Sequence, residues 1–118
     1  MRPIALVMAS LAVLAAPTAA LAHAHLDHAV PAVGSTVTAA PQEVTLFFTQ
    51  NLEPAFSSVA VTDTSGASVT DGKAQIAGNS MHVTLKAVGP GTYTVHWHAV
   101  SVDTHKTQGD FAFRVGGP

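Results

Sequence analysis

The chain has 118 residues, a formal net charge of −2 at pH 7, no cysteine and seven histidines. This length allows one small domain, the lack of cysteine excludes a disulfide framework, and the lack of a basic patch argues against nucleic acid as a partner. All seven histidines lie after residue 22, where the chain has four basic and seven acidic side chains and hence a formal charge of −3. Histidine is therefore the residue type in excess, and its abundance needs an explanation.

The N-terminal segment has the features of a secretory signal peptide. Arg2 precedes an apolar run over residues 4–16, which is shorter than the roughly 20 residues that a membrane-spanning helix needs. The tripeptide at 20–22, Ala-Leu-Ala, then places small residues at the two positions that a signal peptidase reads. We therefore expect residues 1–22 to be removed during export to the periplasm, rather than kept as a membrane anchor, and residues 23–118 to form the mature domain.

Cleavage after Ala22 would make His23 the first residue of the mature protein. A first histidine offers a metal two ligands, its free α-amine and its imidazole. Cleavage after Ala20 or Ala24 satisfies the same small-residue pattern, and the second of these would expose His25 instead.

After the signal peptide the sequence predicts short β-strands and almost no helix. Apolar and polar residues alternate, so that every second side chain would face a core, and turns rich in Gly and Pro separate the segments. Strands are expected at residues 26–30, 43–49, 58–62, 74–76, 81–85, 92–102 and 110–115, with a polar loop at 103–109.

About seven short strands with regular turns predict an all-β fold, a small antiparallel β-sandwich of immunoglobulin-like type. The core would form where the inward faces of the two sheets meet. The side chains expected there are Val44, Leu46, Phe48, Val59, Val61, Met81, Val83, Leu85, Tyr93, Val95, Trp97, Phe111, Phe113 and Val115.

Asp103-Thr104-His105 follows the longest expected strand and is a candidate metal-binding motif. In an extended segment, residues i and i+2 point to the same side, so this carboxylate and imidazole could bind one ion together. Alone the motif is weak, because a turn carboxylate and a surface histidine often have this spacing by chance. It gains weight when it is paired with His23, which would add two nitrogen ligands.

Two stretches of the mature sequence resemble the CopC family of periplasmic copper-resistance proteins. The first is His-Ala-His-Leu-Asp-His-Ala-Val-Pro-Ala-Val-Gly-Ser at residues 23–35. The second is Gly-Thr-Tyr-Thr-Val-His-Trp-His-Ala-Val-Ser-Val-Asp-Thr-His at residues 91–105, followed by Gly-Asp-Phe-Ala-Phe at 109–113. The N-terminal histidine, the Tyr-x-Val-x-Trp strand and the Asp-x-His loop fall in the family's order, and the resemblance covers essentially the whole mature chain.

The resemblance implies a small Greek-key β-sandwich or barrel, cupredoxin-like in form, that binds Cu(II) for copper sequestration, transport and resistance and is not an enzyme. CopC proteins bind Cu(II) through the amine and side chain of the first histidine and through the Asp and His of the Asp-x-His loop. Carried over to this chain, the metal ligands are His23, Asp103 and His105. The resemblance also implies a periplasmic location and a CopD-type inner-membrane copper importer as a partner.

The chemistry of these ligands agrees with the resemblance. An amine, two imidazole nitrogens and a carboxylate oxygen form a tetragonal N₃O set, which suits Cu(II). Cu(II) is also the tightest binder of the divalent series, so the site should prefer it to zinc or nickel. Because the amine must be deprotonated and the imidazoles neutral, the copper affinity should fall below about pH 6.5.

Some CopC proteins have a second, Cu(I) site built from a Met-rich segment and a histidine. The mature part of this chain has only Met81, on the expected core face, so we expect one Cu(II) site and no dedicated Cu(I) site. His25 and His28 add ligand density near the first histidine, and His25 is expected either to hydrogen-bond beside the site or to lie at the surface. His96 and His98 share a strand face and are expected to point to solvent rather than to form a further metal pair.

Two other functions fit parts of the pattern. A histidine brace also forms the copper site of oxidative polysaccharide-cleaving monooxygenases on a similar sandwich, but the Asp103 carboxylate would fill a position that those enzymes keep open and would stabilise Cu(II) against reduction. A metal-free structural sandwich would leave the histidines as surface residues. The pairing of His23 with Asp103 and His105 argues against this second alternative.

Overall fold

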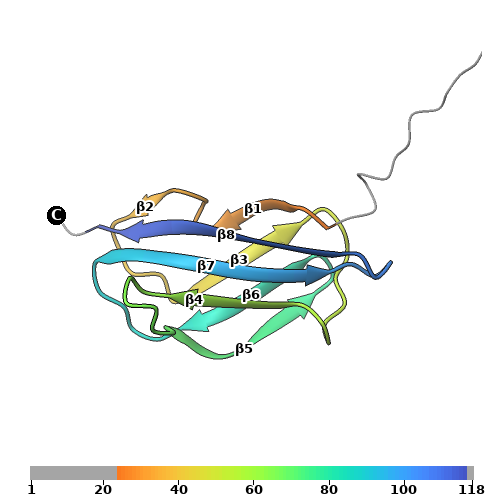
Figure 1. Ribbon diagram of the computed structural model, residues 1–118. Coiled ribbons are helices and arrows are strands. Elements are labelled where there is room, and N and C mark those ends of the chain that lie inside the picture. The colour runs from red at the N-terminus through yellow and green to blue at the C-terminus, as the bar shows by residue number, and fades with distance from the viewer. Residues whose placement is uncertain (1–23, 117–118) are drawn as a thin grey trace, which may run out of the picture.

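The structure is a computed structural model that describes residues 24–116, so the expected signal peptide, His23 and residues 117–118 lie outside the described residues. Its strands form two four-stranded sheets that pack face to face (Figure 1). The first sheet has the order β1 (Leu26–Val30), β3 (Glu43–Phe48), β6 (Ser80–Leu85) and β5 (Thr70–Ala77). The second has the order β2 (Thr36–Val37), β8 (Lys106–Val115), β7 (Gly91–Val100) and β4 (Ser58–Thr62).

Neighbouring strands are antiparallel in both sheets, except that β2 pairs in parallel with the end of β8. The hairpins β5–β6 and β7–β8 each stay within one sheet, whereas the connections on either side of β4 cross between the sheets. The expected all-β sandwich is confirmed. The part of the chain that the structure describes contains no helix, and therefore none that could cross a membrane.

All the inward side chains that the alternation predicts are buried, and the core also contains Ala24, Ala29, Leu52 and Ala99. On β3, Val44, Leu46 and Phe48 are buried, and the side chains between them are only partly so. The rings of Phe48 and Trp97 meet edge to face with centroids 5.0 Å apart, which joins the two sheets. Fully burying one large apolar side chain contributes roughly 1.5–3 kcal/mol, so these alternating positions are the main source of stability.

The expected loop at residues 103–109 is wrong for most of its length, because β8 already pairs with β7 there. The alternation pattern does not predict the start of this strand, because its first two inward residues are Thr107 and Gly109 and not large apolar residues. Gly109 makes room for the Trp97 ring, since a Cβ at this glycine would lie 2.7 Å from Cζ2 of the ring. The Thr107 hydroxyl donates to the carbonyl oxygen of Ala24 at 2.6 Å. The residue type at each of these two positions therefore suits a specific contact and does not add an apolar side chain to the core.

The other differences from the expected strands lie at strand ends. β5 is longer than residues 74–76 because it continues past an irregularity between Asp71 and Gln75. β7 ends at Val100, because Ser101 forms only an isolated bridge with Leu52 and the chain turns at Val102 and Asp103. The two-residue β2 was not expected, because a segment this short cannot show an alternating pattern.

Three segments meet at one end of the sandwich, where the turn between β7 and β8 lies beside the loop that follows β3 (Figure 1). The N–H of Val102 donates to the carbonyl of Asn51 at 3.1 Å, and the N–H of Glu53 donates to the carbonyl of Val100 at 2.7 Å. Ala24, the first residue described, is buried at the same end. This end therefore brings the Asp-x-His motif close to the start of the domain.

Candidate metal centre

The turn between β7 and β8 brings Asp103 and His105 together. Oδ2 of Asp103 lies 3.2 Å from Nδ1 of His105. The segment is not extended as expected, because Thr104 has a φ of +73° and its N–H donates to the carbonyl of Ser101 at 2.8 Å. The Ser101 N–H in turn donates to the carbonyl of His105 at 3.0 Å. The predicted pair is thus formed, but a tight turn and not strand geometry produces it.

The Asp103 carboxylate is held by donors on the turn itself. The hydroxyl of Ser101, a fully buried residue, donates to Oδ1, and the N–H of His105 also points to Oδ1 at 3.3 Å. The Ser101 bond is the main reason that the pKa of Asp103 lies below its ordinary value, and the bond from the His105 ring adds to this effect. The carboxylate is therefore ionised at neutral pH, as a metal ligand must be.

Both side chains of the pair remain reachable from solvent. The side chain of Asp103 is 42% exposed and that of His105 is 50% exposed. A metal ion could therefore enter without any rearrangement of the core.

The start of the domain is fixed on β8 beside this pair. Ala24 is buried, and its carbonyl accepts the hydrogen bond from Thr107, two residues after His105. The next residue is held to the loop after β3: the His25 N–H donates to Oγ1 of Thr49 at 3.0 Å, and the Thr49 N–H donates to the His25 carbonyl at 2.9 Å. The first described residue is therefore anchored to the strand that follows the Asp103–His105 turn.

The described residues supply only part of a metal centre. Within residues 24–116, no three side chains of His, Cys, Asp or Glu are grouped as a metal ion would need. Asp103 and His105 meet, and the third expected ligand, His23, lies outside the described residues. The described residues therefore bring together two of the three expected ligands.

Two other histidines, one on each sheet, each pair with a nearby carboxylate. Nδ1 of His28 lies 2.8 Å from Asp27, and its ring stacks on Phe47 with centroids 4.4 Å apart. Nδ1 of His96 lies 2.8 Å from Asp110, and the other ring nitrogen is 3.0 Å from the Thr62 hydroxyl.

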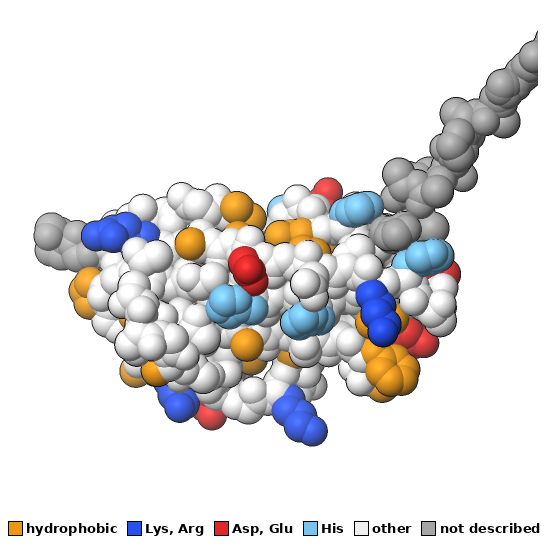
Figure 2. Space-filling model, viewed as in Figure 1, with side chains coloured by type: hydrophobic (Ala, Val, Ile, Leu, Met, Phe, Trp, Pro, Cys, Tyr) orange, Lys and Arg blue, Asp and Glu red, His pale blue; other side chains and the backbone are white. Residues whose placement is uncertain are grey.

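Histidine and acidic side chains accordingly appear on the outer face of the second sheet (Figure 2). His98 is exposed on this face, whereas Met81 is fully buried on the core side, as expected. The part of the chain that the structure describes therefore offers no cluster of soft ligands for Cu(I).

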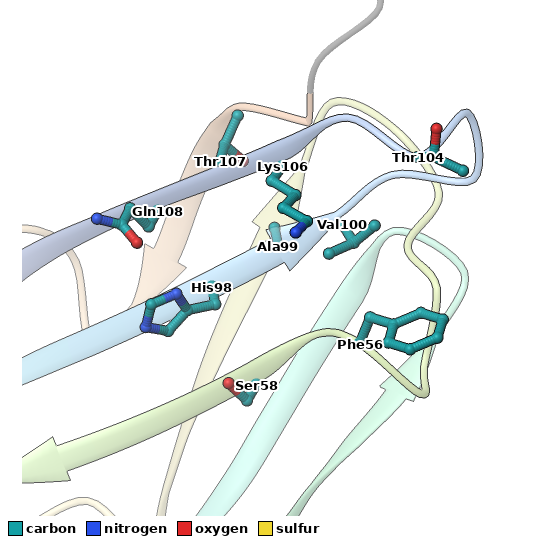
Figure 3. A pocket seen from close by; sticks show the side chains of 9 residues that line it. All are labelled: Phe56, Ser58, His98, Ala99, Val100, Thr104, Lys106, Thr107 and Gln108. Carbon is teal, nitrogen blue, oxygen red and sulfur yellow. The ribbon is translucent and has the colours of Figure 1, made fainter.

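A shallow hollow of about 690 Å³ borders the turn on the outer face of the second sheet (Figure 3). It is lined by Thr104 of the turn and Lys106 of β8, and also by His98 of β7 and Phe56, which precedes β4. The Phe56 ring is 69% exposed. The turn is therefore open on this side.

A CopC domain model matches residues 26–116. The chain belongs to the CopC family. Protein YobA of Escherichia coli (strain K12) is 41% identical over 98 residues, which cover 80% of this chain and 79% of that protein. Copper resistance protein C of Escherichia coli is 35% identical over 106 residues, or 81% of this chain and 83% of that protein. The crystal structure of CopC from Methylosinus trichosporium OB3b aligns with a TM-score of 0.75 and 30% identity, over 80% of this chain and 95% of that one.

CopC proteins are copper resistance and transport proteins, so membership of the family implies that this chain binds copper. The β-sandwich agrees with the CopC structure as well as with the sequence prediction.

Sequence reasoning missed two hydroxyl residues of this CopC sandwich. Ser101 and Thr107 both occupy inward positions of their strand pattern, where an apolar residue is the norm. A polar residue in the inward phase is the signal that could have identified them.

Proposed function

We propose that the mature protein, beginning at His23, binds one Cu(II) ion through four atoms of three residues. The ligands would be the α-amine and imidazole of His23, the carboxylate of Asp103 and the imidazole of His105. The observation that carries this proposal is the hydrogen bond from Thr107 to the Ala24 carbonyl. Since consecutive Cα atoms are about 3.8 Å apart, a residue joined to Ala24 starts within reach of the Asp103–His105 pair.

The ligand chemistry favours Cu(II) over other ions. Three nitrogens and one carboxylate oxygen suit the tetragonal preference of Cu(II), which also leads the divalent affinity series. A hard anionic oxygen supplied by Asp103 stabilises Cu(II) relative to Cu(I). We therefore assign the protein to copper carriage and not to redox catalysis.

Export and copper binding are coupled in this proposal. In the precursor the nitrogen of His23 belongs to a peptide bond to Ala22 and is not an amine, so it cannot act as the same ligand. Removal of residues 1–22 during transfer to the periplasm would create the centre. The protein would there sequester Cu(II) and pass it to a CopD-type inner-membrane importer.

The test is to export the full chain, purify the mature protein from the periplasmic fraction and titrate it with Cu(II) against a competing chelator. We expect an intact mass that starts at His23, one tightly held Cu(II) per chain and an electron paramagnetic resonance (EPR) spectrum with nitrogen hyperfine structure. A protein that starts at His23 and loses all copper on desalting would contradict the proposal.

A further inference from the structure

Ser101 lies at the centre of the turn that carries the Asp103–His105 pair. It is fully buried although it is polar, and it occupies the inward phase that continues from Trp97 and Ala99. Its backbone closes the turn from both sides, donating to His105 and accepting from Thr104 at 3.0 and 2.8 Å. Its hydroxyl donates to Oδ1 of Asp103. A buried polar side chain in this position costs stability unless it forms such bonds.

The hydrogen bond from Ser101 occupies one carboxylate oxygen of Asp103 and leaves the other facing the His105 ring. Oδ1 of Asp103 accepts from the Ser101 hydroxyl and from the His105 N–H at 3.3 Å, whereas Oδ2 faces the His105 ring at 3.2 Å. Without the Ser101 bond, the Asp103 side chain, which is 42% exposed, would be held only by His105 and could adopt other rotamers. Outer partners that fix a ligand in this way are known to raise metal affinity 10- to 100-fold, as a rough range.

We propose that Ser101 is a positioning residue for copper: its hydroxyl locks the Asp103 carboxylate so that Oδ2 is presented beside the His105 ring before the ion arrives. The inference rests on the proposed function, since it concerns the same Cu(II) centre. It adds a residue that contacts a ligand without itself contacting the metal.

The experiment compares S101A with S57A in the mature protein. Ser57 is the matched control, because it is also buried at this end and its hydroxyl oxygen accepts from the Val100 N–H at 3.0 Å, away from the carboxylate. S101A should lower the Cu(II) affinity by about 10-fold and change the EPR hyperfine splitting, while S57A should leave both unchanged. Thermal unfolding of the copper-free variants reports whether each one folds.

Two further variants separate positioning from a general loss of structure. S101T retains the hydroxyl and should bind copper more tightly than S101A. In a D103N background, S101A should cause no further loss of copper affinity, because the carboxylate that it positions is gone. Equal affinities for S101A and the wild type, or an additive loss in the double variant, would overturn the role of Ser101.

The proposed function itself fails by a different result. If D103N binds Cu(II) as tightly as the wild type, Asp103 is not a ligand and the proposed centre is wrong. If D103N loses affinity and S101A does not, the centre stands and the inference about Ser101 falls.

Discussion

Two of the three histidine–carboxylate pairs within residues 24–116 are similar in geometry and different in their surroundings. His105 lies 3.2 Å from Asp103 in the turn after β7, and His96 lies 2.8 Å from Asp110 on the outer face of the second sheet. The four side chains are between 41% and 67% exposed. The distance and exposure of such a pair therefore do not distinguish a metal site from a surface contact.

The difference lies in what surrounds each pair. His96 and Asp110 are directly opposed in the β7–β8 ladder, and the second ring nitrogen of His96 is bonded to Thr62. The turn pair instead lies beside the anchored start of the domain, where Thr107 holds Ala24. In the proposed centre, the turn pair is therefore the one that the amine and imidazole of His23 would join.

The largest expected effect comes from removing a carboxylate of one pair or the other. D103N should lower the Cu(II) affinity by at least about 100-fold, because even residues outside the ligand set change affinity 10- to 100-fold. D110N makes the same chemical change in the sheet pair and should leave the affinity unchanged. Competition titration with a Cu(II) chelator measures both. Similar losses in the two variants would remove the distinction between the pairs.

Strand β8 begins directly after His105 and contains Asp110. Its packing depends on Gly109 having no side chain. G109A should lower the free energy of unfolding by about 1–3 kcal/mol, because the added Cβ would overlap the Trp97 ring. G89A is the matched control, since a Cβ at Gly89 meets no atom within 4 Å. Urea unfolding monitored by Trp97 fluorescence measures both variants. A G109A protein as stable as the wild type would contradict the role of Gly109 in packing against the Trp97 ring.

Gly109 also illustrates how far the sequence predicts this fold. The inward positions of β3 and β7 are apolar at every second residue, so their strands and core could be predicted from the pattern alone. At Thr107 and Gly109 the inward residue serves a contact with a distant residue, and a local pattern contains no information about Ala24, 83 residues away. The pattern therefore predicts a strand that begins at residue 110, whereas β8 begins at Lys106.

The same limit applies to the candidate centre. The pairing of Asp103 with His105 was predicted correctly, but from an extended segment, whereas a tight turn at Thr104 brings them together. The role of Ser101 was not predicted, because its effect depends on burial and on the left-handed turn at Thr104. Ligand residues are visible in a sequence through their chemistry, whereas the residues that orient them become visible only through tertiary contacts.

A smaller effect on copper affinity is expected from removing the hydrogen bond between Thr107 and the Ala24 carbonyl. T107V keeps the shape of the side chain but removes the hydroxyl that holds Ala24. Because one hydrogen bond contributes about 0.5–1.5 kcal/mol, the Cu(II) affinity should fall by about 2- to 12-fold. T62V removes the hydroxyl beside His96 and should have no effect on copper. The prediction fails if the two substitutions change the copper affinity equally.

The smallest effect concerns the titration of the copper-free turn. Donation by Ser101 holds the pKa of Asp103 below its ordinary value. A carboxyl with a lowered folded-state pKa stabilises the fold above its unfolded-state value of about 3.9, and this contribution is lost as the pH falls through the folded-state value. In NMR titrations the Asp103 midpoint should therefore rise in S101A. The pKa of Asp63 is lowered mainly by Ser65 and serves as the internal control, since it should not move.

The most direct test concerns the amine of the first residue. Acetylation at about pH 6.5 favours the α-amine, whose pKa of about 7.7–8.0 is well below that of lysine, and the modified mature protein keeps every side chain. Competition titration should give a Cu(II) affinity at least about 100-fold lower after acetylation of His23, because a ligand and its chelate ring are both lost. Equal affinity in the free and acetylated proteins would contradict a copper centre that links His23 to Asp103 and His105.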